Sequence, residues 1–448
     1  MPEKKGNNKW VYLPIETKVR ELDAKLLLTY YAVQQGYRVV LGLSGMVEQA
    51  LEYLPKGIFL DKGYTCVDKV RRFEMAKSKG HTVVNLEEEG FPLTEKELYL
   101  KKHVSRESLD LLDYELCWGE VQKNTIIRAY PGVRNKCLIT GNPRLDLLKK
   151  KYRTLFEKKA LAIKKKYGDF ILVNTRFPLY TKSINDDGTL NRKVVANLRK
   201  AYGEKIHKKM TREYKDFIIM IKKASTRYPN LTFVIRPHPS DKFNVYQQDL
   251  VECKNVYVVH EDNVVNWIMA SKLVIHTGCT TGVESFLLER PVISYVTTVE
   301  DTFDLPNELS IKVHNLDELF QFMDHEMDSY NFHRHKFNED KKLELLSKHY
   351  AAARESYAYE NILQVLNKLP VAESPLTRVP RHTPLLNKLR KESNKRIYQV
   401  NTIVKQKFPH LTVHEIEDFF KALNHIEKAN HPIVIRKLHD KLFEITPG

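Results

Sequence analysis

The segment Thr232-Phe-Val-Ile-Arg-Pro-His-Pro239 carries the clearest structural signal in the chain. Its first four residues are β-branched or aromatic, which predicts a short buried strand. Pro237 and Pro239 each fix φ near about −65° and disfavour the helical region for the preceding residue. We therefore expect Arg236 and His238 in extended conformation at the carboxyl end of this strand.

A second motif follows further along the chain. Lys272–His276 and Pro291–Tyr295 predict two more buried strands, and Thr277-Gly-Cys-Thr-Thr-Gly-Val-Glu284 lies between them as a turn that opens into a helix. Backbone N–H groups and the helix dipole converge at such a turn and favour an anion. In open α/β sheets, ligands bind beyond the carboxyl ends of the strands. Both motifs therefore predict a ligand that carries phosphate, such as a nucleotide.

Length and charge limit the possibilities. The chain has 448 residues, which suggests two domains, and a formal net charge of +17, which predicts anionic partners. Nucleic acid, an acidic membrane and a phosphorylated substrate all fit that charge, but no nucleic-acid-binding module is visible, so we do not expect nucleic acid. The five cysteines show no paired spacing, and the first residues lack an apolar signal region. We therefore expect a cytoplasmic protein.

Strands alternate with helices along most of the chain. In the first part, Trp10–Leu13, Tyr37–Leu41, Gly57–Leu60 and Thr82–Leu86 predict strands separated by helical segments. This spacing is typical of βαβ units in a parallel sheet. The sequence thus predicts an N-terminal Rossmann-like domain over residues 1–145, a second such domain over 146–370, and a linker with a basic helical extension over 371–448.

Several spaced motifs in one order resemble bacterial surface carbohydrate biosynthesis proteins. They are Tyr12–Thr17, Arg20–Leu28, Glu88-Glu-Gly90, Thr140–Asp146, Asn174–Phe177, Arg236–Pro239 and Thr277–Ser285. The resemblance covers the first 370 residues approximately and implies a GT-B fold, in which two Rossmann-like, doubly wound α/β domains face a cleft. The acidic pair before Gly90 with the downstream His-Pro is similar to sialyl- and Kdo-transferases, which use CMP-activated acidic sugars. The His-Pro and the later turn are also similar to CDP-glycerol glycerophosphotransferases.

The second domain is expected to bind the nucleotide. We predict that His238 donates to a phosphate oxygen and that Arg236 binds the same phosphate or a sugar carboxylate, although Arg236 could equally be structural. Further candidates for phosphate binding lie in the turn before the helix. Helix capping is the alternative explanation for them, because it uses the same hydroxyl and N–H groups. They are Thr277, Gly278, Thr280, Thr281, Gly282, Glu284 and Ser285. We expect His276 to be a satisfied core residue.

The first domain is expected to bind the acceptor and to supply a base. Glu87, Glu88 and Glu89 follow a predicted strand, and crowded carboxylates raise one another's pKa, which suits a general base. We predict Glu89 as the base and Glu88 as the close alternative. The opposing interpretation is a solvated acidic loop. Glu16 and Arg20 are acceptor-side candidates that could equally pair on their helix.

The combined prediction is a glycosyltransferase that transfers an acidic sugar from a CMP-activated donor to a glycan acceptor. The nucleotide donor is a substrate, and we expect neither a cofactor nor a metal, because no Asp-x-Asp motif is present. The alternatives are a CDP-glycerol or other alditol-phosphate transferase, a sugar-nucleotide epimerase of the same fold, and a catalytically dead assembly scaffold. The basic run Lys388–Arg396 leaves open that the protein attaches peripherally to the inner face of the plasma membrane or to the polysaccharide assembly machinery.

Overall fold

The computed structural model describes residues 8–90, 96–298, 304–326, 339–371, 374, 376, 378, 379 and 407–448. They form two compact units, which are treated separately below. The first combines residues 1–155 with 343–448, and the second spans residues 156–342. These boundaries differ from the predicted 145/146 and 370/371, because the chain returns to the first unit well before Pro370.

The first unit is built on a sheet whose strand order is β13-β14-β2-β1-β3-β4-β5-β6. The six strands from the N-terminal part of the chain are parallel. They are β1 (Trp10–Ile15), β2 (Arg38–Leu43), β3 (Ile58–Asp61), β4 (Thr82–Leu86), β5 (Tyr114–Cys117) and β6 (Cys137–Ile139). Every residue of β1 is buried, as expected for a central strand with helices on both faces.

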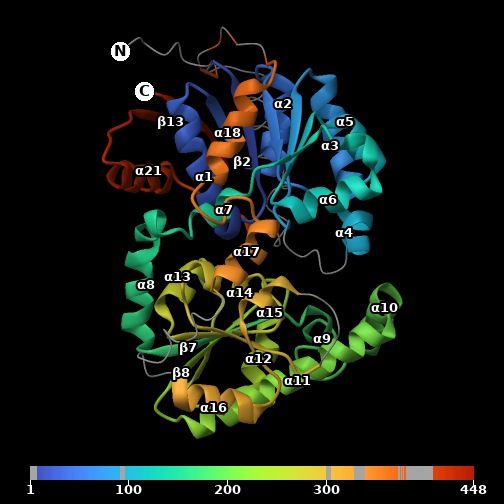
Figure 1. The fold of residues 1–448 in the computed structure, drawn as a ribbon, viewed down its shortest axis with the longest axis vertical. Helices are drawn as coiled ribbons and strands as arrows, with labels where there is room; N and C mark the ends of the chain where they lie inside the picture. The colour runs from blue at the N-terminus through green and yellow to red at the C-terminus, as the bar shows by residue number, and fades with distance from the viewer. Residues whose placement is uncertain are drawn as a thin grey trace. The chain divides into compact units, whose positions relative to one another are not determined.

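Helices connect these strands (Figure 1). They are α1 (Lys18–Gln34), α2 (Ser44–Tyr53), α3 (Cys66–Ser78), α4 (Lys96–His103), α5 (Arg106–Leu111) and α6 (Glu120–Ala129). The short helix α7 (Pro143–Asp146) and the 3-10 turn Lys150–Tyr152 then lead to α8 (Thr154–Tyr167), where the chain passes into the second unit.

The second unit contains one parallel sheet with the order β12-β11-β10-β7-β8-β9. Its strands are β7 (Phe170–Thr175), β8 (Thr232–Pro237), β9 (Val256–Val258), β10 (Leu273–His276), β11 (Val292–Tyr295) and β12 (Ile311–Val313). The helices are α9 (Pro178–Thr181), α10 (Arg192–Tyr202), α11 (Glu204–Arg227), α12 (Phe243–Asp249), α13 (Val264–Ala270), α14 (Thr281–Leu287), α15 (Leu305–Leu309) and α16 (Leu316–Glu326). Two doubly wound α/β units confirm the predicted fold class.

The chain then returns to the first unit. Helix α17 (Glu339–His349) crosses the boundary, and α18 (Ala358–Lys368) is anchored by the buried carboxylate of Asp146. That carboxylate accepts the backbone N–H groups of Ala358 and Tyr359, both at 3.0 Å, and the hydroxyl of Tyr350 at 2.7 Å. These bonds fix the return of the chain.

The C-terminal segment corrects one part of the sequence interpretation. Helix α21 (Val413–Glu427) lies within the region predicted to be helical, but residues 433–447 form the hairpin β13 (Ile433–His439) and β14 (Leu442–Pro447). Strand β14 pairs antiparallel with β2, so the segment extends the sheet of the first unit. The predicted helical extension is therefore wrong over 433–447, because the β-branched residues of this part complete an edge that β2 would otherwise leave open.

The predicted linker and basic run fall mostly outside the described residues. Val379 is described and buried, and its N–H donates to Glu444 Oε1 at 2.6 Å. The run Lys388–Arg396 lies outside the described residues altogether. No helix in the described part of the chain has the length and apolar character needed to cross a bilayer.

We predict that the hairpin contributes to the stability of the first unit. Phe443 in β14 is completely buried, so Phe443→Ala should lower the free energy of unfolding by about 3–5 kcal/mol. Val434→Ala is the matched control, because Val434 lies in the edge strand β13 and is 39% exposed; its effect should stay below about 1 kcal/mol. Urea unfolding curves measure both. Equal midpoints for wild type and Phe443→Ala would show that the tail is dispensable.

Candidate functional site

Each sheet has one point where the strand order reverses, and such switch points are where open α/β sheets bind ligands. In the first unit this point lies between β1 and β3, because β2 continues on one side of β1 and β3 on the other. Glu16 and Thr17 follow β1, and Lys62 follows β3. The sequence therefore places a carboxylate, that of Glu16, and an amine, that of Lys62, at the same edge of the sheet.

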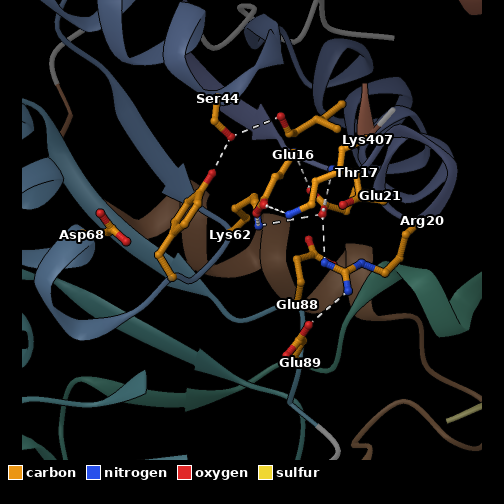
Figure 2. A network of polar contacts seen from close by, with 12 residues as sticks. Glu16, Thr17, Arg20, Glu21, Ser44, Lys62, Asp68, Glu88, Glu89 and Lys407 are labelled. Carbon is orange, nitrogen blue, oxygen red and sulfur yellow. Dashed lines mark hydrogen bonds and ion pairs between the residues drawn. The ribbon is translucent and has the colours of Figure 1, made fainter. Parts of the chain in front are cut away.

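Glu16, Glu21 and Lys62 form an ion-pair network at this point (Figure 2). Lys62 Nζ lies 2.9 Å from Glu16 Oε2 and 3.8 Å from Glu21 Oε1. The Glu21 carboxylate also accepts the N–H groups of Glu16 at 2.9 Å and of Thr17 at 3.2 Å. Glu21 thus holds the loop between β1 and α1 and places a negative charge at the N-terminus of α1, where the helix dipole favours it.

Lys407, from the C-terminal segment, reaches the same network. Its Nζ lies 2.5 Å from Glu16 Oε1 (Figure 2). Burial by itself would raise the pKa of Glu16, but Lys62 and Lys407 outweigh burial and lower that pKa to about 2. Glu16 is therefore an anion at neutral pH that already has two cationic partners, and Lys18 pairs with Glu415 at 2.6 Å beside it.

Two of the three consecutive glutamates after β4 are buried, which the interpretation as a solvated acidic loop did not anticipate. Glu87 pairs with Lys69 of α3 at 3.1 Å, and Glu88 pairs with Lys25 of α1 at 3.0 Å. Burial would raise both pKa values, but Lys69 with His103 lowers the pKa of Glu87 to about 2, and Lys25 lowers the pKa of Glu88. The premise that crowding raises these pKa values is wrong, because each carboxylate meets a cation from a different helix.

Glu89 differs from its two neighbours. Its side chain is 52% exposed, and its Oε1 lies 3.1 Å from Arg20 Nη1. Arg20 also pairs with Glu21 at 3.2 Å, so the guanidinium connects the glutamate loop to the switch-point network (Figure 2). The structure thus brings Glu16, Arg20 and Glu89 together, and Glu89 is the one member of the acidic run whose carboxylate solvent reaches.

In the second unit the strand order reverses between β7 and β10. Asn174 in β7 lies in register with His276 of β10 on one side and Arg236 of β8 on the other. Its side chain is buried, and its Nδ2 has no hydrogen-bond partner among the described residues. A buried amide donor without a partner costs free energy, so this position is one where a ligand acceptor would be favoured.

His238 is exposed just beyond β8. Its Nδ1 accepts the backbone N–H of Ser240 at 3.1 Å and lies 2.8 Å from Ser240 Oγ. Because Nδ1 accepts from a backbone N–H, a neutral ring carries its proton on Nε2. The backbone N–H of His238 donates to Thr175 O at 3.0 Å, which ties its loop to the end of β7.

Arg236 has a structural role in this unit. Its guanidinium donates to the backbone carbonyls of Glu261 and Asp262 and lies over the Trp267 ring, 5.8 Å from the centroid. Burial lowers the pKa of Arg236 to about 10, so it stays cationic at neutral pH. These contacts hold the loop after β9. They fit the structural role that the sequence analysis gave as the alternative to ligand binding by Arg236.

The turn after β10 is held by its own residues and by the loop around α15. Gly278 has φ of +55°, which a side chain would strain, and its N–H donates to Asn307 Oδ1 at 3.1 Å. His276 is completely buried, with Nε2 at 2.8 Å from Ser310 Oγ, and burial lowers its pKa to about 3. The expectation of a satisfied core histidine is thus consistent with its contacts.

The turn candidates fall into two groups. Thr277, Gly278, Thr280 and Thr281 are partly exposed, whereas Gly282, Glu284 and Ser285 are buried. Ser285 Oγ donates to Thr281 O at 2.7 Å, a bond internal to α14. The partly exposed threonines are therefore better placed for a ligand than Glu284 or Ser285.

Several residues of these sites were not predicted from the sequence. Lys62, Lys25, Lys69 and Lys407 are ordinary lysines in the sequence, and only their distant carboxylate partners distinguish them. Asn174 lay within a recognised motif but had no assigned role. A signal was available for Lys62, because it directly follows a strand at the reversal of strand order.

Comparison with known proteins gives structural matches only. No family model matches the chain, and no curated protein matches its sequence. A solved UDP-N-acetylglucosamine 2-epimerase matches 84% of this chain and 100% of its own, with 13% identity and a TM-score of 0.50. The wall teichoic acid polymerase TagF matches 82% of this chain and 90% of its own, with 12% identity and a TM-score of 0.50. The chain has a GT-B-like fold. Identities this low show the fold alone, so the GT-B-like architecture leaves the activity to be argued from the residues.

We predict an acid-dependent loss of stability from the buried glutamates. Glu87 has a pKa lowered from 4.5 to about 2, so its contribution is fully present above the unfolded pKa and is lost as the pH falls toward 2. Over the whole pH range between the unfolded and folded pKa values, this contribution to the free energy of unfolding amounts to roughly 3 kcal/mol. In Glu87→Gln, the free energy of unfolding should therefore fall less between about pH 5 and about pH 3 than in wild type.

Urea unfolding at several pH values measures this slope. Glu89→Gln is the control, because it makes the same change at a half-exposed position of the same run. Parallel curves for wild type and Glu87→Gln would contradict the prediction.

Proposed function

We propose that this GT-B-like chain is a glycosyltransferase of surface polysaccharide synthesis that uses a nucleotide-activated sugar. The observation that carries the proposal is the carboxyl edge of the second sheet at β7 and β8. There a buried amide donor, Asn174, lacks a described partner, and an exposed imidazole, His238, is fixed with its proton on Nε2. Two donors at the carboxyl ends of adjacent strands suit the phosphate of a nucleotide.

His238 would stabilise the charge that develops on the phosphate as the nucleotide leaves. Its ring is already oriented by Ser240, so little reorganisation is needed when a phosphate oxygen accepts from Nε2. Thr277, Thr280 and Thr281 would add hydroxyl donors, with Gly278 and Gly282 shaping the turn. Arg236 would act by holding the neighbouring loop, and its positive charge would favour the anionic donor from a distance.

The first unit would bind the acceptor and supply the base. Glu89 is the proposed base, because its carboxylate is half exposed while Glu87 and Glu88 are buried in ion pairs. Arg20 would orient Glu89, and Glu88 would position the loop through Lys25. The base would take the proton of the acceptor hydroxyl as the new C–O bond forms to the anomeric carbon and the bond to the nucleotide breaks.

A CMP-activated acidic sugar is the donor that we propose, on the resemblance of the acidic pair and the His-Pro. The fold is shared with a teichoic acid polymerase and with an epimerase acting on UDP-N-acetylglucosamine, so an alditol-phosphate transferase and an epimerase are the competing activities. Hydrogen bonds from His238 and the positive charge of Arg236 would make a metal dispensable, which stays a prediction.

A donor panel distinguishes these activities. Thermal-shift titrations with CMP, CDP, UDP and GDP should show stabilisation by a cytidine nucleotide, because a ligand that binds only the native state raises stability. Product analysis with the matching nucleotide sugars then separates transfer from epimerisation. Stabilisation by UDP alone would favour the epimerase, and binding without turnover would favour a scaffold.

We predict that His238→Ala weakens donor handling and leaves the fold intact. A charge-assisted hydrogen bond to phosphate is worth about 1.5–3 kcal/mol, so nucleotide affinity or turnover should fall roughly tenfold to a hundredfold. Ser240→Ala is a companion variant that removes one of the two contacts to Nδ1 and should cause a smaller loss. Wild-type affinity together with wild-type turnover in folded His238→Ala would exclude this role.

We also predict that Glu89→Gln lowers turnover by about 10²–10⁴-fold while donor affinity stays unchanged. Glu52→Gln is a matched control, because Glu52 is an exposed glutamate of α2 in the same unit. Both variants are tested for secondary structure, nucleotide binding and transfer to a glycan acceptor. Full activity of Glu89→Gln would remove Glu89 from the mechanism.

A further inference from the structure

Residues 190–213 form a strongly basic surface on the second unit that the proposed function does not use. This segment, the basic arm, contains α10, the turn at Gly203 and the first part of α11. It carries eight Lys or Arg and two Glu, which gives a net charge of +6 (eight minus two). Figure 1 shows α10 standing out from the rest of the second unit at the end of the long helix α11.

The basic arm contributes little to the core of the unit. From residue 190 to 213 only Val195 and His207 are buried, whereas α11 beyond this point supplies Tyr214, Phe217 and Ile221 to the core. A segment that packs so little gains little stability from burial, so its charge and exposure call for another explanation.

Apolar side chains are exposed among these charges. Tyr202 is 45% exposed and Ile206 is 41% exposed, on either side of Gly203, and Leu190 before α10 is 52% exposed. Gly203 has φ of +91°, which allows the sharp turn between the two helices. The turn therefore presents an aromatic and an aliphatic side chain beside the basic residues Lys200 and Lys205.

The charges on the arm are only partly neutralised. Glu204 pairs with Arg199 at 2.8 Å and with Lys208 at 3.3 Å, but Lys193, Lys200 and Lys205 make no ion pair with any described residue. These three lysines are exposed. A surface of this charge attracts an anionic partner, and basic residues beside an anionic leaflet each favour binding.

We propose that the basic arm docks on an anionic lipid membrane. Lysines alone would suit any polyanion, but Tyr202 and Ile206 add what a membrane interface accepts: an aromatic ring at the headgroup level and an aliphatic side chain below it. A soluble polyanion such as polyphosphate provides no apolar layer for these two residues. The arm thus attaches the second unit to the membrane.

The test is sedimentation of the full chain with lipid vesicles. Wild type should sediment with vesicles that contain phosphatidylglycerol and stay in solution with pure phosphatidylcholine. Lys200→Gln with Lys205→Gln should lower the partition coefficient roughly tenfold or more, because each basic residue contributes to attraction by the leaflet. The matched control is Lys158→Gln with Lys165→Gln, which removes the same charge from exposed positions of α8 in the same unit.

Tyr202→Ser with Ile206→Ser tests the apolar contribution. In about 1 M salt, where the Debye length is about 3 Å, electrostatic attraction is screened and the binding that remains should depend on these two residues. Circular dichroism confirms that each variant is folded.

The proposal fails if wild type does not bind the anionic vesicles or if the arm variant binds like wild type, in which case residues outside the arm are responsible. It also fails if the arm variant and the α8 control variant lose vesicle binding equally, because binding would then depend on the overall charge of the unit and not on the arm. If Tyr202→Ser with Ile206→Ser binds the vesicles at high salt as strongly as wild type does, the two apolar side chains do not contribute. The arm would then be a general polyanion-binding surface, and the assignment to a membrane would be overturned.

Discussion

A carboxylate removed from water needs a cation or hydrogen-bond donors, and pairing with cations organises the edge of the first sheet. Glu87 and Glu88 are adjacent in sequence and directly follow β4. Each meets a lysine from a different helix, Lys69 of α3 or Lys25 of α1. Two neighbouring residues thereby fasten two helices to one point, and Glu89 is left as the acid that solvent reaches.

Ion pairs and strand pairing connect the C-terminal segment to the first unit. Lys407 pairs with Glu16, and Lys18 pairs with Glu415, while β14 adds main-chain hydrogen bonds along β2. Gly42 of β2 permits this approach, because a Cβ there would lie only 2.1 Å from Lys441 O. The tail thus covers a sheet edge and reaches the switch-point network, so that part of the candidate acceptor site comes from the end of the chain.

The carboxyl edge of the second sheet differs from that of the first, because it presents neutral hydrogen-bond donors. Its charged group, Arg236, is used inside the unit to hold a loop by its carbonyls, and the ligand-directed groups are neutral donors, Asn174 and His238. Placing orienting bonds on one nitrogen of His238 fixes the tautomer, which is the property that a phosphate-binding imidazole needs. The unit therefore prepares hydrogen-bond geometry at this edge, whereas the first unit concentrates paired charge.

The amino-acid sequence was enough to predict the βα alternation, the strand from Thr82 to Leu86 and the positions of the polar motifs at the ends of strands, because these depend on local hydrophobic period and on proline geometry. It also indicated the acidic run and the His-Pro as candidates. Only the tertiary structure decided which glutamate stays accessible, because that depends on lysines supplied by other helices. It likewise decided that residues 433–447 form strands of the first sheet and that Lys407 meets Glu16, a partner 391 residues away. Such pairings have no local signature: an edge strand or a lysine acquires its role only when folding brings a distant backbone or carboxylate beside it.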